Sequence, residues 1–284
     1  MVAPSSPFDE AAFARGVERL RRRYDVRHGQ GVLARTGFLA GDDARRIEEL
    51  RDAIADHTVD AIVAARGGYG ATRILPALRT ADIARRPKLL VGFSDVTALH
   101  AAWLRAGVRA IHGPMVAALG DAGEPLVDRW IAAVEGEPMP PIERLEPIAG
   151  GRAEGPLVGG NLAVLCALVG TPYAPPIDGC VLFLEDVGEP PYRVDRMLTT
   201  LHHAGWLARA VGVVLGAFEG GDPGPDGVDV DDVLAERLPD LGIPVARGLS
   251  AGHVDDNLEL PLGAPVRLDA DAGTLAFLEP AVRR

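Results

Sequence analysis

Three side chains of the kinds that serine hydrolases use stand where apolar stretches of this sequence open into polar segments. Ser94 follows the apolar run 89–91 and precedes a helical pattern, Glu185 ends the apolar run 181–184, and His253 lies in a loop after a glycine. A serine hydroxyl becomes nucleophilic at neutral pH only when a neighbouring base takes its proton, histidine can be that base, and a carboxylate can orient the histidine. The three residue types therefore fit acyl transfer, provided that folding brings them together.

Each of these residues also has a plainer explanation. Ser94 and Asp95 both suit the N-cap of the helix that follows, a strand-end glutamate is often a loop acid, and a loop histidine is often structural. The G-x-S-x-G pattern of a nucleophile elbow is absent, because the chain reads Gly92-Phe93-Ser94-Asp95-Val96. From the residues alone, a serine hydrolase and a set of structural residues both stay open.

A glycine-rich stretch, ARGGYGATRILP at 65–76, follows a predicted strand. Such a turn lets backbone N–H groups approach a ligand closely. It is not a phosphate-binding P-loop, because no lysine follows, and Arg73 stands where a dinucleotide fingerprint would need its third glycine. A ligand-binding turn and a plain tight turn are both compatible with it.

Metal and redox chemistry have little support in the sequence. Cys166 and Cys180 lie in apolar runs, which predicts packed thiols and neither a disulfide nor a metal site. The histidines lack the short fixed spacing of metal ligands, and we expect no metal and no cofactor. His112 lies close to the strand that precedes Ser94, and we expect it to line the same pocket.

Alternating elements surround these residues. Predicted strands at 59–68, 88–94 and 108–115 alternate with helical patterns at 41–56 and 95–107, which indicates a parallel sheet with covered faces and ligands beyond its carboxyl edge. A second block is mixed, with strands at 181–187, 211–218, 265–271 and 274–280 and helices at 161–170 and 194–207. The last two strands read as a hairpin.

The domain organisation follows from these blocks. We expect an N-terminal α/β domain at 1–133, a linker rich in proline, glycine and charge at 134–155, and a C-terminal domain at 156–284. With 284 residues, 48% of them hydrophobic, the chain is typical of a globular protein, and a net charge of −11 argues against nucleic acid or anionic membrane as a partner. The first residues lack a signal-peptide pattern and no apolar run would span a membrane, so we expect a soluble, cytoplasmic protein.

Six motifs together resemble one family, the LD-carboxypeptidases, which contains muramoyltetrapeptide carboxypeptidases and microcin C immunity peptidases. The resemblance covers nearly the whole chain, and its motifs occur in the family's order. They are ARGGYGATRILP, GFSDVTALH, HGPM, GPLVGGNLAVLCALVGTP, LFLEDVGEPPYRVDRML and GHVDDNLELPLG.

This resemblance implies roles for the residues singled out above. Ser94 would be the nucleophile, His253 the general base and Glu185 the acid that orients it, while the backbone N–H groups of Gly68 and Asp95 would form the oxyanion hole. It also implies an N-terminal parallel-sheet domain of flavodoxin or Rossmann type, a smaller mixed α/β C-terminal domain, an active site in the cleft between them, and a homodimer.

The implied reaction releases the terminal D-alanine of a murein tetrapeptide during peptidoglycan recycling. Arg66 or Arg193 could bind the carboxylate of this substrate, although each also suits a structural ion pair. Alternatives are a microcin-C-like acyl-amide hydrolase with the same triad and a non-catalytic muropeptide-binding protein. The chain lacks room for the long insertion of the microcin-type branch, which favours a role in cell-wall recycling. The first predicted strand, at MVAPSSP, is shorter than the family's usual pattern, so the start of the chain could be misassigned.

Overall fold

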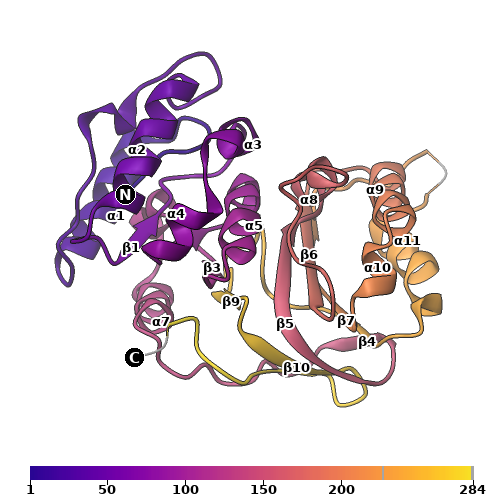
Figure 1. Cartoon of the computed structure of the whole chain (residues 1–284). Helices are drawn as coiled ribbons and strands as arrows, with labels where there is room; N and C mark the ends of the chain where they lie inside the picture. Colours follow the sequence, from indigo (N-terminus) through magenta and orange to yellow (C-terminus); the bar gives the residue numbers. More distant parts are fainter. Residues whose placement is uncertain (226, 283–284) are drawn as a thin grey trace.

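The computed structural model describes residues 1–225 and 227–282, and within them the strands form two sheets (Figure 1). The first sheet has the order β1-β2-β3-β9, with β1 to β3 parallel and β9 antiparallel to β3. Its strands are β1 (Ala61–Val63), β2 (Leu89–Gly92), β3 (Ala110–His112) and β9 (Leu260–Leu262). The three parallel strands lie inside the ranges predicted from the sequence.

Helices cover both faces of this first sheet because successive residues of its strands are apolar on both sides. Ile62 and Leu90 belong to one buried cluster, whereas their neighbours Val63 and Val91 belong to another. The first cluster includes residues of α2 (Asp43–Ala55), α3 (Ala71–Ile74), α4 (Thr80–Arg85) and α5 (Thr97–Arg105). The second includes residues of α1 (Glu10–Arg21), α6 (Val116–Asp121) and α7 (Glu124–Val134).

The second sheet is mixed, with the order β11-β10-β5-β6-β7-β8-β4. Its four inner strands, β5 to β8, run parallel, while β10, β11 and β4 are antiparallel to their neighbours. The strands are β4 (Glu146–Ala149), β5 (Arg152–Asn161), β6 (Val181–Val187), β7 (Gly212–Glu219), β8 (Val245–Arg247), β10 (Pro265–Asp269) and β11 (Thr274–Phe277). The mixed second half expected from the sequence is therefore confirmed, and β10 and β11 form the expected hairpin.

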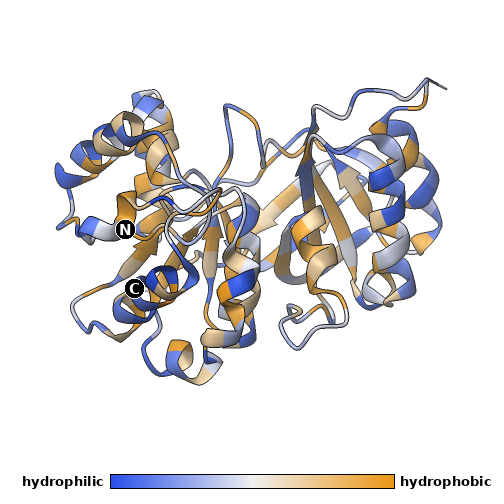
Figure 2. Ribbon diagram, turned by 90° about the horizontal axis from the view of Figure 1, so that it is seen from above, coloured by the Kyte–Doolittle hydropathy of each residue, from blue (hydrophilic) through white to orange (hydrophobic). Residues whose placement is uncertain are grey.

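Four helices accompany the second sheet, namely α8 (Leu162–Leu168), α9 (Pro191–His203), α10 (Trp206–Arg209) and α11 (Val230–Arg237). Figure 2 shows the strands of both sheets as largely hydrophobic, with helices flanking them whose outward faces are largely hydrophilic. Helix α5 lies between the two halves of the molecule, where it contacts β5 and α8 (Figure 1). Among the described residues, no helix combines the length and the apolar character needed to cross a bilayer.

Three features differ from the expected domain layout. The expected linker at 134–155 contains β4 and the first residues of β5, and β9 joins the N-terminal sheet although it comes late in the chain. The C-terminal half also carries the larger sheet. The sequence of β4, Glu-Pro-Ile-Ala, reads as a loop because proline cannot donate to a ladder and is confined to edge strands such as this one. Where the chain divides into domains stays a prediction.

Candidate active site

Ser94 lies at a sharp strand-to-helix turn. It follows β2 and begins a short 3₁₀ turn, Ser94–Val96, that leads into α5. Its φ is 63°, in the left-handed region that non-glycine residues rarely occupy. The N-cap of α5 is Val96, and no side chain caps either this helix or the 3₁₀ turn. The local backbone thus presents the hydroxyl beyond the carboxyl edge of the sheet rather than using it as a helix cap.

The structure brings Ser94, His253 and Glu185 into one chain of contacts. His253 Nε2 lies 3.1 Å from Ser94 Oγ, and His253 Nδ1 lies 2.8 Å from Glu185 Oε2. These pairs are separated by 159 and 68 residues in the sequence. A neutral imidazole that donates from Nδ1 to the carboxylate leaves Nε2 free to accept the serine proton. The arrangement can therefore perform general-base activation of a serine.

Glu185 is held in the interior, and the surrounding backbone is shaped around it. Its side chain is 0% exposed, whereas that of His253 is 22% exposed. The pairing of β6 with β7 shifts register at Glu185, where two residues of β7, Gly216 and Ala217, lie opposite one residue of β6 and form a β-bulge. The N–H of Ala217 donates to Ala251 O at 2.9 Å. The bulge thereby guides the segment that carries His253 toward the carboxylate.

Gly252 lets the histidine approach the acid closely. Its φ is 120°, and a Cβ at this position would lie 2.7 Å from Glu185 Oε2. An L-residue here would meet both backbone strain and a clash with the carboxylate. A glycine directly before His253 is therefore required by the geometry of the His253–Glu185 pair.

The loop that carries His253 is fastened by residues that the sequence analysis did not single out. Asn257 Oδ1 accepts the N–H of Gly252 at 2.8 Å. Arg129 of α7 donates to Glu259 Oε2 and to Asp256 Oδ1, each at 2.7 Å, and Glu259 is fully buried. An arginine 130 positions away from its partner gives no local sequence signal. The charged and amide side chains of the last motif were the available hint.

The glycine-rich turn at 67–71 packs against Ser94. A Cβ on Gly67 would lie 2.9 Å from Ser94 Cβ and 3.1 Å from its Oγ, so only a glycine allows this approach. The carboxylate of Asp95, which is 2% exposed, accepts the N–H of Ala71 at 2.8 Å, and burial raises the pKa of this carboxyl. Asp95 therefore ties the turn to the segment that carries the hydroxyl.

The two backbone N–H groups expected to form the oxyanion hole belong to Gly68 and Asp95. Within residues 1–225 and 227–282, neither N–H donates to an acceptor. Gly68 has a φ of 108°, and a Cβ there would lie 2.4 Å from Ser6 Oγ. Ser6 in turn accepts the N–H of Tyr69 at 3.0 Å, which supports the turn from the N-terminal side. The oxyanion-hole role of these two N–H groups stays a prediction.

In the described chain, none of the other residues expected to bind substrate forms a hydrogen bond with Ser94, His253 or Glu185. Arg66 is exposed and donates to the carbonyl of Pro7 at 2.9 Å, and Arg193 is exposed in the first turn of α9, 3.4 Å from Glu189. His112 was expected to line the pocket, but its side chain is 0% exposed. The reason is that β3 is an interior strand and places this ring against Phe93 and Phe183, at centroid distances of 5.5 and 4.9 Å.

Burial also governs the remaining titratable groups near the sheets. It lowers the pKa of His112 well below its usual value and raises the pKa of the Cys166 and Cys180 thiols to about 12. In the described part of the chain, no three His, Cys, Asp or Glu side chains gather as metal ligands would.

Comparison with known proteins identifies relatives over nearly the whole chain. Models of the LD-carboxypeptidase N-terminal and C-terminal domains match residues 1–113 and 154–268. A Streptomyces coelicolor protein that is provisionally named a carboxypeptidase is 40% identical, over 99% of this chain and 93% of its own length. The murein tetrapeptide carboxypeptidase of Pseudomonas aeruginosa is 32% identical, over 95% of this chain and 92% of its own length.

A solved structure extends the likeness to the whole fold. The crystal structure of muramoyltetrapeptide carboxypeptidase from Oxalobacter formigenes superposes with a TM-score of 0.87 at 32% identity, covering 98% of this chain and 99% of that one. The resemblance inferred from the six sequence motifs is thereby confirmed. This chain belongs to the LD-carboxypeptidase family.

Proposed function

We propose that this protein is a serine LD-carboxypeptidase that releases the terminal D-alanine of a murein tetrapeptide. The observation that carries the proposal is the contact chain from Ser94 Oγ through His253 to Glu185. The relatives named murein tetrapeptide and muramoyltetrapeptide carboxypeptidase support the substrate class. In this proposal the site lies in the cleft between an N-terminal parallel-sheet domain of flavodoxin or Rossmann type and a C-terminal mixed domain.

In the first step, Ser94 Oγ attacks the carbonyl carbon of the bond between diaminopimelate and D-alanine. His253 Nε2 accepts the hydroxyl proton as the new C–O bond forms. The buried Glu185 carboxylate holds Nδ1–H and stabilises the imidazolium that results. The carbonyl oxygen becomes an oxyanion, and the N–H groups of Gly68 and Asp95 are the donors proposed to receive it.

In the second step, the tetrahedral intermediate collapses and the C–N bond breaks. His253 gives its proton to the leaving amine, so that D-alanine departs and an acyl-enzyme ester on Ser94 remains. Water then attacks this ester with His253 again as the base, which frees the tripeptide and restores the serine hydroxyl.

Recognition of the free C-terminal carboxylate calls for a cation near the site. Arg66 and Arg193 stay the proposed candidates, and both are exposed on the surface of the protein. Arg66 directly precedes the glycine-rich turn that packs against Ser94, which favours it over Arg193. The homodimer and the cytoplasmic location also stay predictions.

The test is to incubate the purified protein with free murein tetrapeptide and to measure released D-alanine. The proposal expects D-alanine and tripeptide in equal amounts, no product from the Ser94→Ala variant, and unchanged turnover after treatment with a metal chelator. Two parallel substrates define the specificity, namely a tetrapeptide with an amidated C-terminus and a microcin-like acyl-sulfamoyl adenylate. Equal cleavage of the amidated peptide would contradict a carboxypeptidase, and exclusive cleavage of the acyl adenylate would favour the microcin-type alternative.

A further inference from the structure

Arg46 of α2 is a charged side chain with no exposed surface, and the proposed mechanism gives it no part. It is one of the largest side chains that the fold buries completely. An arginine is rarely buried in this way unless its N–H groups are paired, because taking a guanidinium out of water is costly. The groups that accept its N–H donors therefore show which part of the fold it holds.

The guanidinium of Arg46 joins the glycine-rich turn to the N-terminal segment and to the first turn of its own helix. Nη1 donates to Gly70 O at 2.8 Å and to Pro4 O, and Nη2 donates to the Asp43 carboxylate. The same carboxylate accepts two N–H groups of Arg73, in the helix that follows the turn, at 3.0 and 2.8 Å. A Cβ on Gly70 would lie 2.5 Å from Nη1, so only a glycine allows this approach.

Ser6 holds the same turn from the N-terminal segment, two residues after Pro4. Its N–H donates to Gly67 O at 3.2 Å, and its Oγ accepts the N–H of Tyr69 at 3.0 Å. Gly67 C=O and Gly68 N–H belong to one peptide group, which is planar and has its C=O and N–H pointing in opposite directions. The bond from Ser6 therefore sets the direction of the Gly68 N–H.

We propose that Arg46 is a positioning residue for the oxyanion hole, because it fixes the Ser6 segment against the turn and thereby the direction of the Gly68 N–H. Its two backbone acceptors lie two residues before Ser6 and two residues after Gly68, so one side chain spans both partners of the bond that orients this N–H. The inference rests on the proposed function, in which the Gly68 N–H receives the oxyanion.

Arg46 also lies near the second proposed donor, Asp95. Burial raises the pKa of the Asp95 carboxyl, and the charge of Arg46 opposes this rise. The ionised carboxylate makes the stronger bond to the Ala71 N–H, at 2.8 Å, because a charge-assisted hydrogen bond is stronger than a neutral one. Loss of the guanidinium should thus loosen the turn at two places, at Gly67 and at Ala71.

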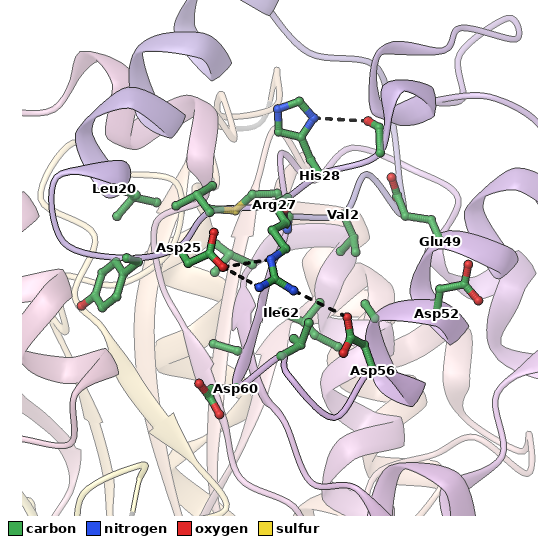
Figure 3. A pocket seen from close by; sticks show the side chains of 18 of the residues that line it. Val2, Leu20, Asp25, Arg27, His28, Glu49, Asp52, Asp56, Asp60 and Ile62 are labelled. Atoms are coloured by element: carbon green, nitrogen blue, oxygen red, sulfur yellow. Dashed lines mark hydrogen bonds and ion pairs between the residues drawn. The ribbon is translucent and has the colours of Figure 1, made fainter.

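Arg45, the preceding residue of α2, is a matched control for a general loosening of this helix. It donates to Ala3 O at 2.6 Å, to Gly31 O at 2.9 Å and to Glu49 at 3.0 Å. With Glu49 it lines the cavity of about 620 Å³ shown in Figure 3, and none of these bonds reaches the glycine-rich turn. Arg45→Met and Arg46→Met each remove a guanidinium that ties α2 to the N-terminal segment, but only the second releases the turn.

The first measurement is D-alanine release from murein tetrapeptide by the wild type and the two methionine variants. We expect Arg46→Met to lower kcat at least about tenfold and to change KM less than about threefold, because the Gly68 N–H stabilises the transition state rather than the bound substrate. Arg45→Met should keep kcat within about twofold of the wild type, because none of the groups that it releases stabilises the transition state. If Arg46→Met does not fold, Arg46→Lys replaces it, with an expected loss in kcat of at least about threefold, because an ammonium cannot reproduce the planar fork of donors.

A fluorophosphonate tests the same donors without any assumption about the natural substrate. Ser94 Oγ attacks phosphorus, its proton passes to His253, fluoride leaves, and the phosphoryl oxygen takes the charge that an oxyanion hole stabilises. The adduct on Ser94, followed by its mass, should form at least about tenfold more slowly in Arg46→Met than in Arg45→Met. Amide hydrogen exchange at Ala71 should be at least about tenfold faster in Arg46→Met than in Arg45→Met, because the turn opens more often.

The outcomes separate this inference from the proposed function. If the wild type reacts with the fluorophosphonate but releases no D-alanine, the proposed substrate is wrong, and the phosphonylation rates decide the role of Arg46. A wild type that does neither would overturn both. Equal phosphonylation rates and equal exchange in the two arginine variants, or a loss in kcat of the same size in both, would overturn the inference alone.

Discussion

Replacement of Ser94 by alanine and by glycine separates the chemistry of its hydroxyl from the strain of its backbone. Both variants lack Oγ, so both should abolish D-alanine release. They should differ in stability, because the native φ of 63° suits glycine and not alanine.

The magnitude follows from two opposing terms. Holding a non-glycine residue in the left-handed region costs roughly 1–2 kcal/mol, and glycine avoids this cost. Glycine in turn loses more backbone freedom on folding, which costs roughly 0.5–1 kcal/mol. The difference leaves Ser94→Gly about 0.5–1 kcal/mol more stable than Ser94→Ala, although glycine is the less stabilising residue at most other positions.

Urea unfolding of both variants at pH 7 measures this difference. A matched control is Glu48, an exposed residue inside α2, where glycine should be about 1 kcal/mol less stable than alanine. The order of the two substitutions should therefore invert between the sites. If alanine were as stable as glycine at position 94, or more stable, the turn would not be strained and the reasoning would fail.

Three further predictions concern the surroundings of the site. Arg129→Ala should destabilise the fold by about 3 kcal/mol, because it leaves the buried carboxylate of Glu259 without its ion-pair partner. In steady-state kinetics it should lower kcat more than it changes KM, because the loop that carries His253 loses its contact with α7. An unchanged kcat would contradict this role. Burial lowers the pKa of His100 to about 3 and that of His112 well below its usual value. At acid pH the unfolded chain therefore binds more protons at these two positions than the folded protein does. The contribution of each neutral histidine to the free energy of unfolding is fully present above about pH 6.5 and should fall by about 1.4 kcal/mol per pH unit below about pH 6. Urea titrations of the wild type and of His112→Leu at pH 5, 6 and 7 isolate the contribution of His112, because the slope of the variant should be shallower by about 1.4 kcal/mol per pH unit. Gly67→Ala should lower kcat about 10²-fold, because its Cβ would lie 3.1 Å from the nucleophilic oxygen. Tm and kcat are measured on the same sample, and a variant with an unchanged Tm and full activity would contradict this prediction.

Much of the fold was predictable because it depends on neighbouring residues. The apolar runs that became β1, β2 and β3, the helical pattern after Ser94 and the hairpin of β10 and β11 are all recorded in local periodicity. The turn chemistry was local too, since consecutive glycines follow β1 and Ser94 follows β2. The family could be inferred for a related reason, because each motif is a short contiguous segment.

Sequence by itself thus determined the residue types and their places at strand ends, while the tertiary structure decided which of them meet. His253 contacts Ser94 across 159 residues because a β-bulge in β7 and the glycine at position 252 direct its loop toward Glu185. Arg129 of α7 meets Glu259 because β9, which directly follows Glu259, pairs with β3 at the edge of the first sheet. Such pairings follow from strand order and crossover paths, which depend on the packing of whole layers and leave no trace in the spacing of adjacent residues.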